Sequence, residues 1–481
     1  MPDTSPPPPS LPPAVRDRLS ALLGPRGLLL DPAAIAAHAA DWRALFRGGA
    51  LAVLRPESTA ECAEAVRVCA EAGLAIVPQA GNTSLVGGST PFGRGDEVVL
   101  SVARMNRILE VDPVGMTMVV EAGAVLAAVQ SAAAEAGCLF PLSLASEGTA
   151  QIGGLIGTNA GGNTTLRYGN MREQVLGLEV VLADGSVLDL MRRLRKDNTG
   201  YALRQLFIGA EGTLGIVTKA VLRLMPAPRE VELAFVAVAS VEAALELLGR
   251  IRRHDGPSLN AFEYMGRFGI ELVLRHIPGT QDPFAAPHRH YCLIELASPR
   301  PQAGLRGVLE TVLAGALEDG VALDAVLAES ESQRRALWRL REEHAEAQKR
   351  DSASVKNDVS VPIPRIPDLL RQGTEAVARL IPGVRPCAFG HLGDGNIHFN
   401  FSRPPDLSDE AFLARWDEIT EAVNGVVRRL GGSFAAEHGI GRLKTPTLAE
   451  WRAGPELEAM RRIKRALDPR GIFNPGKVVQ P

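Results

Sequence analysis

Two histidines lie in a motif whose spacing suits chemistry. His391 and His398 both fall within GHLGDGNIHFNF (390–401). The Gly-Asp-Gly predicts a turn, and the alternation over Asn396 to Phe401 predicts a strand with His398 and Asn400 on one face. We expect the apolar face of this strand to pack into a core and the polar face to line a pocket.

A second motif, AAEHGIG (435–441), places Glu437 beside a third histidine, His438. Two imidazoles and a carboxylate with open positions form a typical catalytic zinc set, so the two motifs together indicate a metal site. Neighbouring residues of an extended chain point apart, so if Glu437 faces the metal, His438 faces another wall of the pocket. An imidazole, with its ordinary pKa of about 6.5, suits a general base. The alternative is that these histidines are surface or capping residues beside glycine turns.

Two cations, Arg341 and Lys356, lie on a predicted helix and on the strand predicted after it. Leu337 to Lys349 predicts a charged helix, and Ser354 to Val361 predicts a strand that carries Lys356 on its polar face. From the residues alone, both cations are ordinarily solvated charges.

Three glycine-rich segments precede these motifs, at 79–89, 147–163 and 209–218. Glycine permits positive φ and removes Cβ, so consecutive N–H groups can converge on an anion such as a pyrophosphate. Their spacing matches neither GxGxxG nor GxxxxGK[ST], which disfavours a nicotinamide-binding Rossmann unit and a P-loop. One such loop is explained by a flexible turn, but three indicate a large bound cofactor.

The elements that must position these residues change in rhythm near Arg229. Short strands and helices precede it, and strands that alternate with longer helices follow, which predicts an α+β unit with helices on one face of a sheet. We therefore expect a disordered Pro-rich tail (1–13), an N-terminal domain (14–225), a middle domain (226–430) and a C-terminal return (431–481).

Composition excludes several classes of function. The 481 residues carry a net charge of -3, which leaves no basic field for nucleic acid or anionic lipid. No run approaches the ~20 apolar residues of a membrane span. The five cysteines form no CxxC pair, which disfavours a disulfide framework or an iron–sulfur cluster. Free thiols and the lack of a signal-like N-terminus predict a cytoplasmic protein.

The order of motifs resembles a known family. The segments are PQAGNTSLVGGS, GGLIGTNAGGNTTLRYGNMREQVLGLEVVLADG, RKDNTGYALRQLFIGAEGTLGIVT, GHLGDGNIHFNF, AEHGIGR and LDPRGIFNPGK. From about Trp42 to Lys477 the chain resembles the FAD-dependent D-2-hydroxyacid dehydrogenases of the vanillyl-alcohol oxidase type, and most closely those acting on D-2-hydroxyglutarate. The resemblance implies an α+β fold with a two-subdomain FAD-binding domain, a substrate (cap) domain with an antiparallel sheet, and a C-terminal helical return.

The resemblance implies noncovalent FAD, because the first glycine loop lacks the histidine that bonds the flavin in some relatives. The residues it assigns to FAD are Pro78, Gln79, Ala80, Gly81, Asn82, Thr83, Ser84, Gly148, Thr149, Gly153, Gly154, Thr158, Asn159, Gly161, Gly212, Ile216, Val217 and Asn474.

The resemblance also implies roles for residues in the later part of the chain. His391, His398 and Glu437 would bind a divalent metal, most often Zn²⁺, with Mn²⁺ or Co²⁺ as alternatives. His438 would be the general base, and the substrate would contact Arg341, Lys356, Asn400 and His438. The hydroxylated residue that the closest relatives carry four positions after the arginine is Ala345 here, which predicts weaker or rearranged contacts to a distal carboxylate.

The resulting hypothesis is oxidation of a D-2-hydroxyacid, best represented by D-2-hydroxyglutarate, to its 2-oxoacid, with hydride transfer from C2 to flavin N5. An electron-transferring flavoprotein or a quinone-linked acceptor would reoxidise the flavin, and similar proteins are commonly homodimers. The alternatives are a D-lactate or glycolate dehydrogenase, a zinc hydrolase using the same ligands, and a flavin-binding protein without catalytic activity.

Overall fold

The structure, a computed structural model, describes residues 10–480 and divides into two compact units. Unit 1 comprises the chain up to 162, 169–226 and 437 onward, and unit 2 comprises 163–168 and 227–436. Residues 1–9 of the expected Pro-rich tail lie outside the described residues. The first helix begins at Pro13. Among residues 10–480, no helix has the length and apolar character needed to cross a membrane.

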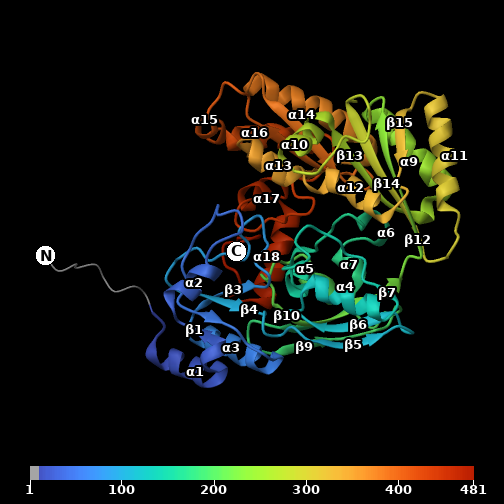
Figure 1. Ribbon diagram of the computed structural model, residues 1–481. Helices are drawn as coiled ribbons and strands as arrows, with labels where there is room; N and C mark the ends of the chain where they lie inside the picture. The colour runs from blue at the N-terminus through green and yellow to red at the C-terminus, as the bar shows by residue number, and fades with distance from the viewer. Residues whose placement is uncertain (1–9, 481) are drawn as a thin grey trace. The chain divides into compact units, whose positions relative to one another are not determined.

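The first sheet of unit 1 has four strands in the order β1-β2-β4-β3, of which β2, β4 and β3 are parallel (Figure 1). The Ser58 hydroxyl accepts a hydrogen bond from the Glu61 amide and so begins α3. The buried face of α3 includes Cys62, Val66 and Cys69, whose spacing of four and three residues predicts one face of a helix. The elements are α1 (Pro13–Gly27), β1 (Leu28–Leu29), α2 (Pro32–His38), β2 (Val53–Leu54), α3 (Thr59–Glu71), β3 (Ala75–Gln79) and β4 (Glu97–Ser101).

The second sheet of unit 1 is antiparallel, with five strands in the order β5-β6-β10-β8-β9. Its strands are β5 (Ile108–Asp112), β6 (Thr117–Glu121), β8 (Val175–Val181), β9 (Val187–Leu190) and β10 (Ile216–Arg223). The accompanying helices are α4 (Leu126–Glu135), α5 (Ile152–Thr158), α7 (Met171–Gln174) and α8 (Arg204–Phe207), and β7 (Cys138–Leu139) pairs with β11 (Met225–Pro226).

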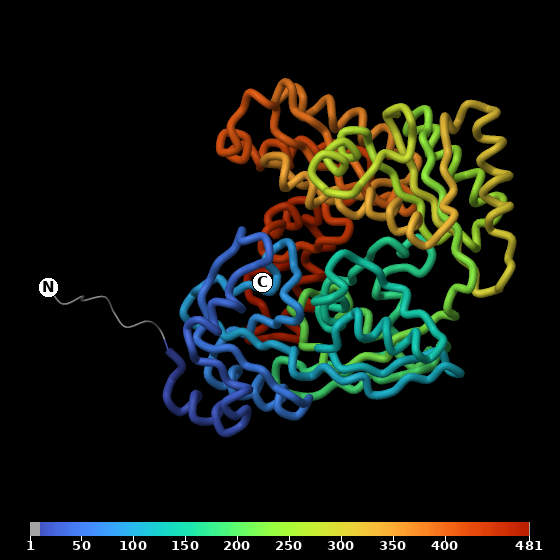
Figure 2. The backbone as a smooth tube through the Cα atoms, viewed as in Figure 1, coloured from blue at the N-terminus to red at the C-terminus, as the bar shows by residue number. Residues whose placement is uncertain are grey.

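The C-terminal segment of the chain returns to the first sheet of unit 1. It contains α17 (Thr445–Trp451) and α18 (Pro455–Leu467), and Phe473 then forms a parallel bridge with Ile76 of β3. Figure 2 shows this red segment beside the blue strands. The buried ammonium of Lys464 fixes the return by donating to the carbonyls of Thr213 (2.7 Å) and Phe473 (2.8 Å).

Unit 2 is built on one antiparallel sheet in the order β15-β12-β14-β13-β18-β19-β16, with β17 also paired to β19. The strands are β12 (Glu230–Val238), β13 (Leu259–Gly266), β14 (His290–Ser298), β15 (Ala322–Leu327), β16 (Ser354–Val355), β17 (Asp358–Ser360), β18 (Arg385–Gly390) and β19 (Asn396–Ser402). The antiparallel sheet of the expected substrate domain is therefore present.

Helices cover both faces of this sheet, so the expectation of helices on one face is wrong. Phe235, Tyr291 and Phe389 pack with α10, α12 and α13, whereas Phe399, on the opposite face, packs against Gly373 of α14. Both faces of the strands are apolar, which a helix layer on each side requires. The helices are α6 (Thr165–Tyr168), α9 (Val241–Asp255), α10 (Arg267–His276), α11 (Leu305–Glu318), α12 (Glu331–Glu342), α13 (His344–Asp351), α14 (Ile366–Leu380), α15 (Asp409–Leu413) and α16 (Trp416–Arg429).

Two elements predicted as continuous are interrupted. The expected helix over Leu337 to Lys349 breaks at Glu343, between α12 and α13. The expected strand from Ser354 breaks between β16 and β17, because the Asn357 amide bonds the side chain of Asn400 instead of a strand carbonyl. The pairing of β16 and of β17 with β19 nevertheless keeps one register.

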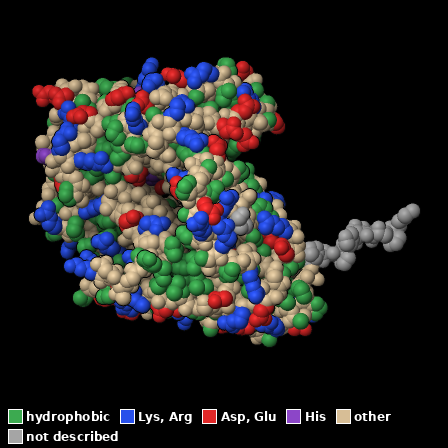
Figure 3. Space-filling model, turned by 180° about the vertical axis from the view of Figure 1, so that it is seen from behind, with side chains coloured by type: hydrophobic (Ala, Val, Ile, Leu, Met, Phe, Trp, Pro, Cys, Tyr) green, Lys and Arg blue, Asp and Glu red, His purple; other side chains and the backbone are tan. Residues whose placement is uncertain are grey.

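The surface carries both signs of charge. Figure 3 shows Lys and Arg side chains interspersed with Asp and Glu over the visible face. Many are close pairs on one helix, such as Arg350 with Glu346. This face therefore presents no extended field of one sign.

Candidate functional site

The polar side chains of unit 2 gather because four strands place them on one face of the sheet. Asp358 is paired with His398, and His398 with Phe389. Tyr264 is paired with Gly390, so the same register sets His391 opposite Glu263. Directly opposite residues of antiparallel strands share a face. The alternation predicted for β19 is confirmed, since Ile397 and its two apolar partners along the strand are fully buried.

Glu263 links the first histidine to an arginine of α12. Its Oε1 lies 2.7 Å from Nδ1 of His391, and its Oε2 accepts a hydrogen bond from Nε of Arg341 at 2.6 Å. Burial alone would raise the pKa of Glu263, but His391 and Arg341 outweigh burial and lower this pKa to about 2. The carboxylate is therefore ionised, and Nδ1 of His391 serves as the donor to it.

Arg341 presents an open end of its guanidinium. Its side chain is 7% exposed and lies over the ring of Phe389, 5.1 Å from the centroid. Within residues 10–480 its two terminal nitrogens form no hydrogen bond, because only Nε is bonded. Two parallel N–H groups of this kind match a carboxylate.

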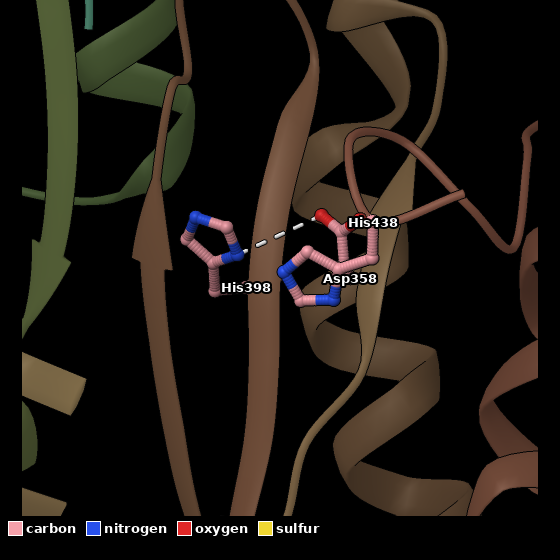
Figure 4. A group of neighbouring side chains, drawn as sticks. All are labelled: Asp358, His398 and His438. Carbon is pink, nitrogen blue, oxygen red and sulfur yellow. Dashed lines mark ion pairs between the residues drawn. The ribbon is translucent and has the colours of Figure 1, made fainter. Parts of the chain in front are cut away.

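His398 lies against the end of β17. Its Nδ1 is 3.6 Å from Oδ1 of Asp358, an ion-pair distance that Figure 4 marks with a dashed line. The same oxygen accepts a hydrogen bond from the Asn396 side chain at 2.9 Å, and the rings of His391 and His398 lie 5.7 Å apart. The two imidazoles therefore stand on one face, each beside a buried carboxylate.

Lys356 and Asn400 are opposite each other in the register that β16 and β17 share. The Asn400 amide donates to Oε1 of Gln348 at 2.9 Å and accepts from the Asn357 amide at 3.1 Å. One N–H of Asn400 remains for a substrate. Both predicted substrate residues thus lie on the same sheet face as His398.

Neither His344 nor Ala345 supplies the hydroxyl group that the closest relatives carry four positions after the arginine. Ala345 is exposed on α13, and His344 is buried with its Nδ1 3.1 Å from the Arg341 carbonyl. Burial, with the Arg341 charge nearby, lowers the pKa of His344 to about 3, so its ring is neutral. Its Nε2 is buried without a partner among the described residues.

Glu437 and His438 begin the last segment of unit 1, and both are half-buried. The preceding residues belong to unit 2, where Ser433 exchanges backbone hydrogen bonds with Ser360 and the Ala436 amide donates to the Asp358 carbonyl at 3.4 Å. Glu437 therefore follows directly on a residue bonded to β17.

The three glycine loops of unit 1 converge. A Cβ on Gly81 would lie 2.2 Å from the Thr149 carbonyl oxygen, and one on Gly212 would lie 2.9 Å from Pro78. The Asn474 side chain donates to the carbonyls of Gly88 and Glu211, both at 2.9 Å, and so ties the first loop to the third. The predicted FAD residues thus meet at the end of β3.

The first loop offers a row of donors that suits a pyrophosphate. Within residues 10–480, the backbone N–H groups of residues 81–85 donate no hydrogen bond. Asn82 has φ of 53°, a left-handed conformation that turns successive N–H groups to one side. These residues fit the diphosphate of FAD.

Three predicted FAD side chains serve the loop itself. Gln79 donates to the Ser89 carbonyl at 3.0 Å, Asn82 accepts from the Ser89 hydroxyl at 2.7 Å, and the Ser84 hydroxyl accepts from the Gly88 amide at 3.4 Å. The remaining predicted positions lie on α5 or beside it (Gly148, Thr149, Gly153, Gly154, Thr158, Asn159, Gly161) and at the start of β10 (Ile216, Val217).

Reasoning from the sequence missed Glu263. The only local signal is a carboxylate in the otherwise apolar strand LNAFEYMG, where burial demands a charged partner. The partners are 78 and 128 residues away along the chain.

Two family models match the chain. Residues 227–478 match the model described as FAD linked oxidases, C-terminal domain, and residues 50–191 match the FAD binding domain.

Curated relatives match nearly the whole chain. The mitochondrial D-2-hydroxyglutarate dehydrogenase of Bos taurus is 40% identical over 96% of this chain and 83% of its own. The D-2-hydroxyglutarate dehydrogenase of Xanthomonas citri pv. viticola is 38% identical over 94% of each chain. A putative mitochondrial D-lactate dehydrogenase of Schizosaccharomyces pombe is 37% identical over 93% of this chain and 85% of its own.

Solved structures share the fold. The 4-ethylphenol oxidase of Gulosibacter chungangensis superposes with a TM-score of 0.75 at 20% identity, and p-cresol methylhydroxylase with 0.74 at 16%. Each covers 97% of this chain and 96% of its own. These likenesses confirm the α+β flavoprotein fold expected from the sequence.

Proposed function

We propose, from the premise that this chain belongs to the FAD-linked oxidase family, that it oxidises D-2-hydroxyglutarate to the 2-oxoacid. Relatives at 37–40% identity bear the names of D-2-hydroxyglutarate dehydrogenases and of a putative D-lactate dehydrogenase, all of which would act on D-2-hydroxyacids. The two matching family models indicate FAD as the cofactor. Bound FAD supplies the two-electron acceptor for the hydride from C2.

The observation that carries the proposal is that the Glu263 carboxylate binds two side chains at once, one at each oxygen. One carboxylate fixes His391 through Nδ1 and Arg341 through Nε, which leaves both terminal nitrogens of the arginine for a ligand. A histidine held by a carboxylate in this way is typical of a metal ligand, and an arginine held by Nε presents its fork to a carboxylate.

We propose that His391, His398 and Glu437 hold a divalent ion, with zinc as the first candidate. The nitrogen and oxygen donors fit such an ion, and Glu437 is joined to Ala436, which bonds the backbone of Asp358 beside His398. A divalent ion supplies stabilisation of the charge that develops on the substrate hydroxyl oxygen.

The remaining residues bind the substrate and move its proton. Arg341 and Lys356 hold carboxylate groups, and Asn400 donates its remaining N–H. His438, a half-buried imidazole, takes the hydroxyl proton as the general base. Noncovalent FAD is held by the backbone of residues 81–85 and the loops packed on it.

A D-lactate dehydrogenase is the second candidate. Ala345 is an exposed methyl group where a hydroxyl would assist a distal carboxylate, and a relative bears the name of a putative D-lactate dehydrogenase. Turnover of D-2-hydroxyglutarate, D-malate and D-lactate with an artificial acceptor separates the two candidates. We expect the highest kcat/KM for D-2-hydroxyglutarate, and a preference for D-lactate would overturn the dicarboxylate assignment.

In this proposal, the reduced flavin passes its electrons to an external acceptor. All five cysteines are free and buried, so they provide no internal relay. An electron-transferring flavoprotein or a quinone-linked protein is the proposed acceptor, and buried free thiols are compatible with the reducing cytoplasm.

A further inference from the structure

Glu211 is a carboxylate to which the proposed reaction gives no part, yet it holds the segment that follows His438. Its Oε1 accepts a hydrogen bond from the Ile440 amide and its Oε2 accepts one from the Gly441 amide, both at 2.8 Å. Hydrogen bonds to two consecutive amides fix that backbone more firmly than one such bond would.

The backbone of Glu211 is itself constrained. Its φ is 50°, which is unfavourable for a residue with a side chain and persists only where the surroundings determine it. The Glu211 amide donates to the Gly157 carbonyl of α5 at 2.8 Å, and its carbonyl accepts from the Asn474 side chain at 2.9 Å. The backbone of Glu211, within the third glycine loop, is thus bonded to the second glycine loop and to the C-terminal segment.

The first glycine loop holds the other side of the same segment. The Val86 carbonyl accepts from the amides of Arg442 (3.0 Å) and Leu443 (3.3 Å). Gly439 and Gly441 have φ of 77° and 52°, and a Cβ on them would lie 2.7 Å from Glu211 Oε1 and 2.3 Å from the Val86 carbonyl oxygen. Residues 439–443 are therefore clamped between loops that fit FAD.

We propose that Glu211 is a positioning residue that couples the flavin loops to the placement of His438. The inference rests on the proposed role of His438 as the base. The carboxylate touches neither substrate nor flavin in this account, and it acts by holding the backbone next to the base.

The experiment replaces the carboxylate by its amide, Glu211→Gln, in the FAD-loaded enzyme. The amide keeps one acceptor oxygen and turns N–H groups toward the second backbone donor, so hydrogen exchange at residues 440 and 441 should become about 10- to 100-fold faster. FAD content should not change. The kcat should fall about 10- to 100-fold with KM within about twofold of wild type.

Two further variants sharpen the test. Gly439→Ala disturbs the contact from the other side and should reproduce the exchange and kcat effects. Glu121→Gln is the matched control, because this buried carboxylate also accepts a backbone N–H, from Arg107 at 2.8 Å, but does not contact residues 439–443. It should leave both readouts at wild-type values.

Wild-type exchange in both Glu211→Gln and Gly439→Ala would overturn the clamp. Faster exchange with unchanged kcat would overturn its coupling to His438. If the wild-type enzyme oxidised no D-2-hydroxyacid, the proposed function would fail, whereas the exchange comparison would still uphold or overturn the clamp.

Discussion

His391 stands directly across the sheet from Glu263, with Nδ1 and Oε1 2.7 Å apart. The pairing of β13 with β18 creates this relationship between residues 128 positions apart in the chain. The histidine is thereby fixed in one orientation, with Nε2 turned away from the carboxylate.

Replacing Glu263 by Gln should therefore weaken metal binding. The amide cannot accept from both His391 and Arg341 as a carboxylate does, and loss of such a partner typically costs 10- to 100-fold in metal affinity, so we expect about that loss. Zinc titration against a competing chelator measures it. Glu295→Gln on the adjacent strand β14 is the control, because Glu295 bonds Asn260 and Trp338 instead.

Lys356→Ala should discriminate between substrates. A charged hydrogen bond to a second carboxylate contributes roughly 1.5–3 kcal/mol, so KM for D-2-hydroxyglutarate should rise about 10- to 100-fold while KM for D-lactate stays within about threefold. Steady-state kinetics with both substrates measure the difference, with Lys349→Ala, an exposed lysine of α13, as the control. Equal losses for both substrates would contradict the role given to Lys356.

Gly81→Ala should expel the flavin. The added methyl group would lie 2.2 Å from the Thr149 carbonyl oxygen, so the first two glycine loops must separate. Overpacking costs about 1–3 kcal/mol, which predicts a loss of FAD affinity of about 5- to 150-fold. The flavin-to-protein absorbance ratio after dialysis reports this, and Gly49→Ala, whose Cβ would meet only Gly93 at 4.0 Å, should retain FAD.

His344 should make unit 2 sensitive to acid. An unfolded histidine has a pKa of about 6.5, whereas the pKa of folded His344 is about 3, so the unfolded state binds more protons between these values. The stability contributed by the neutral ring is complete above about pH 6.5 and is lost as the pH falls toward 3.

We expect wild type to lose about 2 kcal/mol more than His344→Met on going from pH 7 to pH 5. Urea unfolding at the two pH values measures this difference. His254→Gln, which removes an exposed histidine, should behave as wild type. A His344→Met protein with the acid sensitivity of wild type would show that another group is responsible.

Sequence patterns predicted the features of the fold that depend only on neighbouring residues in the chain. The alternation of β19 and the buried face of α3 follow from periods of 2 and 3.6, and both appear in the structure. The convergence of three glycine loops follows from their shared lack of side chains. The partnership of Glu263 with His391 depends on strand register, which no local pattern specifies.

The interruptions of predicted elements have a similar cause. The Asn400 side chain captures the Asn357 amide and splits the strand that carries Lys356, although these residues are far apart in sequence. Residues 163–168 join unit 2 through contacts such as Arg167 to the Ala297 carbonyl at 2.6 Å. Side-chain capture of this kind overrides the propensity of a segment.

The most direct test of the account is anaerobic mixing of the FAD-loaded enzyme with D-2-hydroxyglutarate, before and after chelation of the metal. We predict rapid bleaching of the flavin absorbance in the metal-loaded enzyme, a rate at least about 100-fold lower after chelation, and recovery on adding zinc. Absence of bleaching by any D-2-hydroxyacid, or bleaching at an unchanged rate in the stripped enzyme, would contradict a metal-assisted hydride transfer.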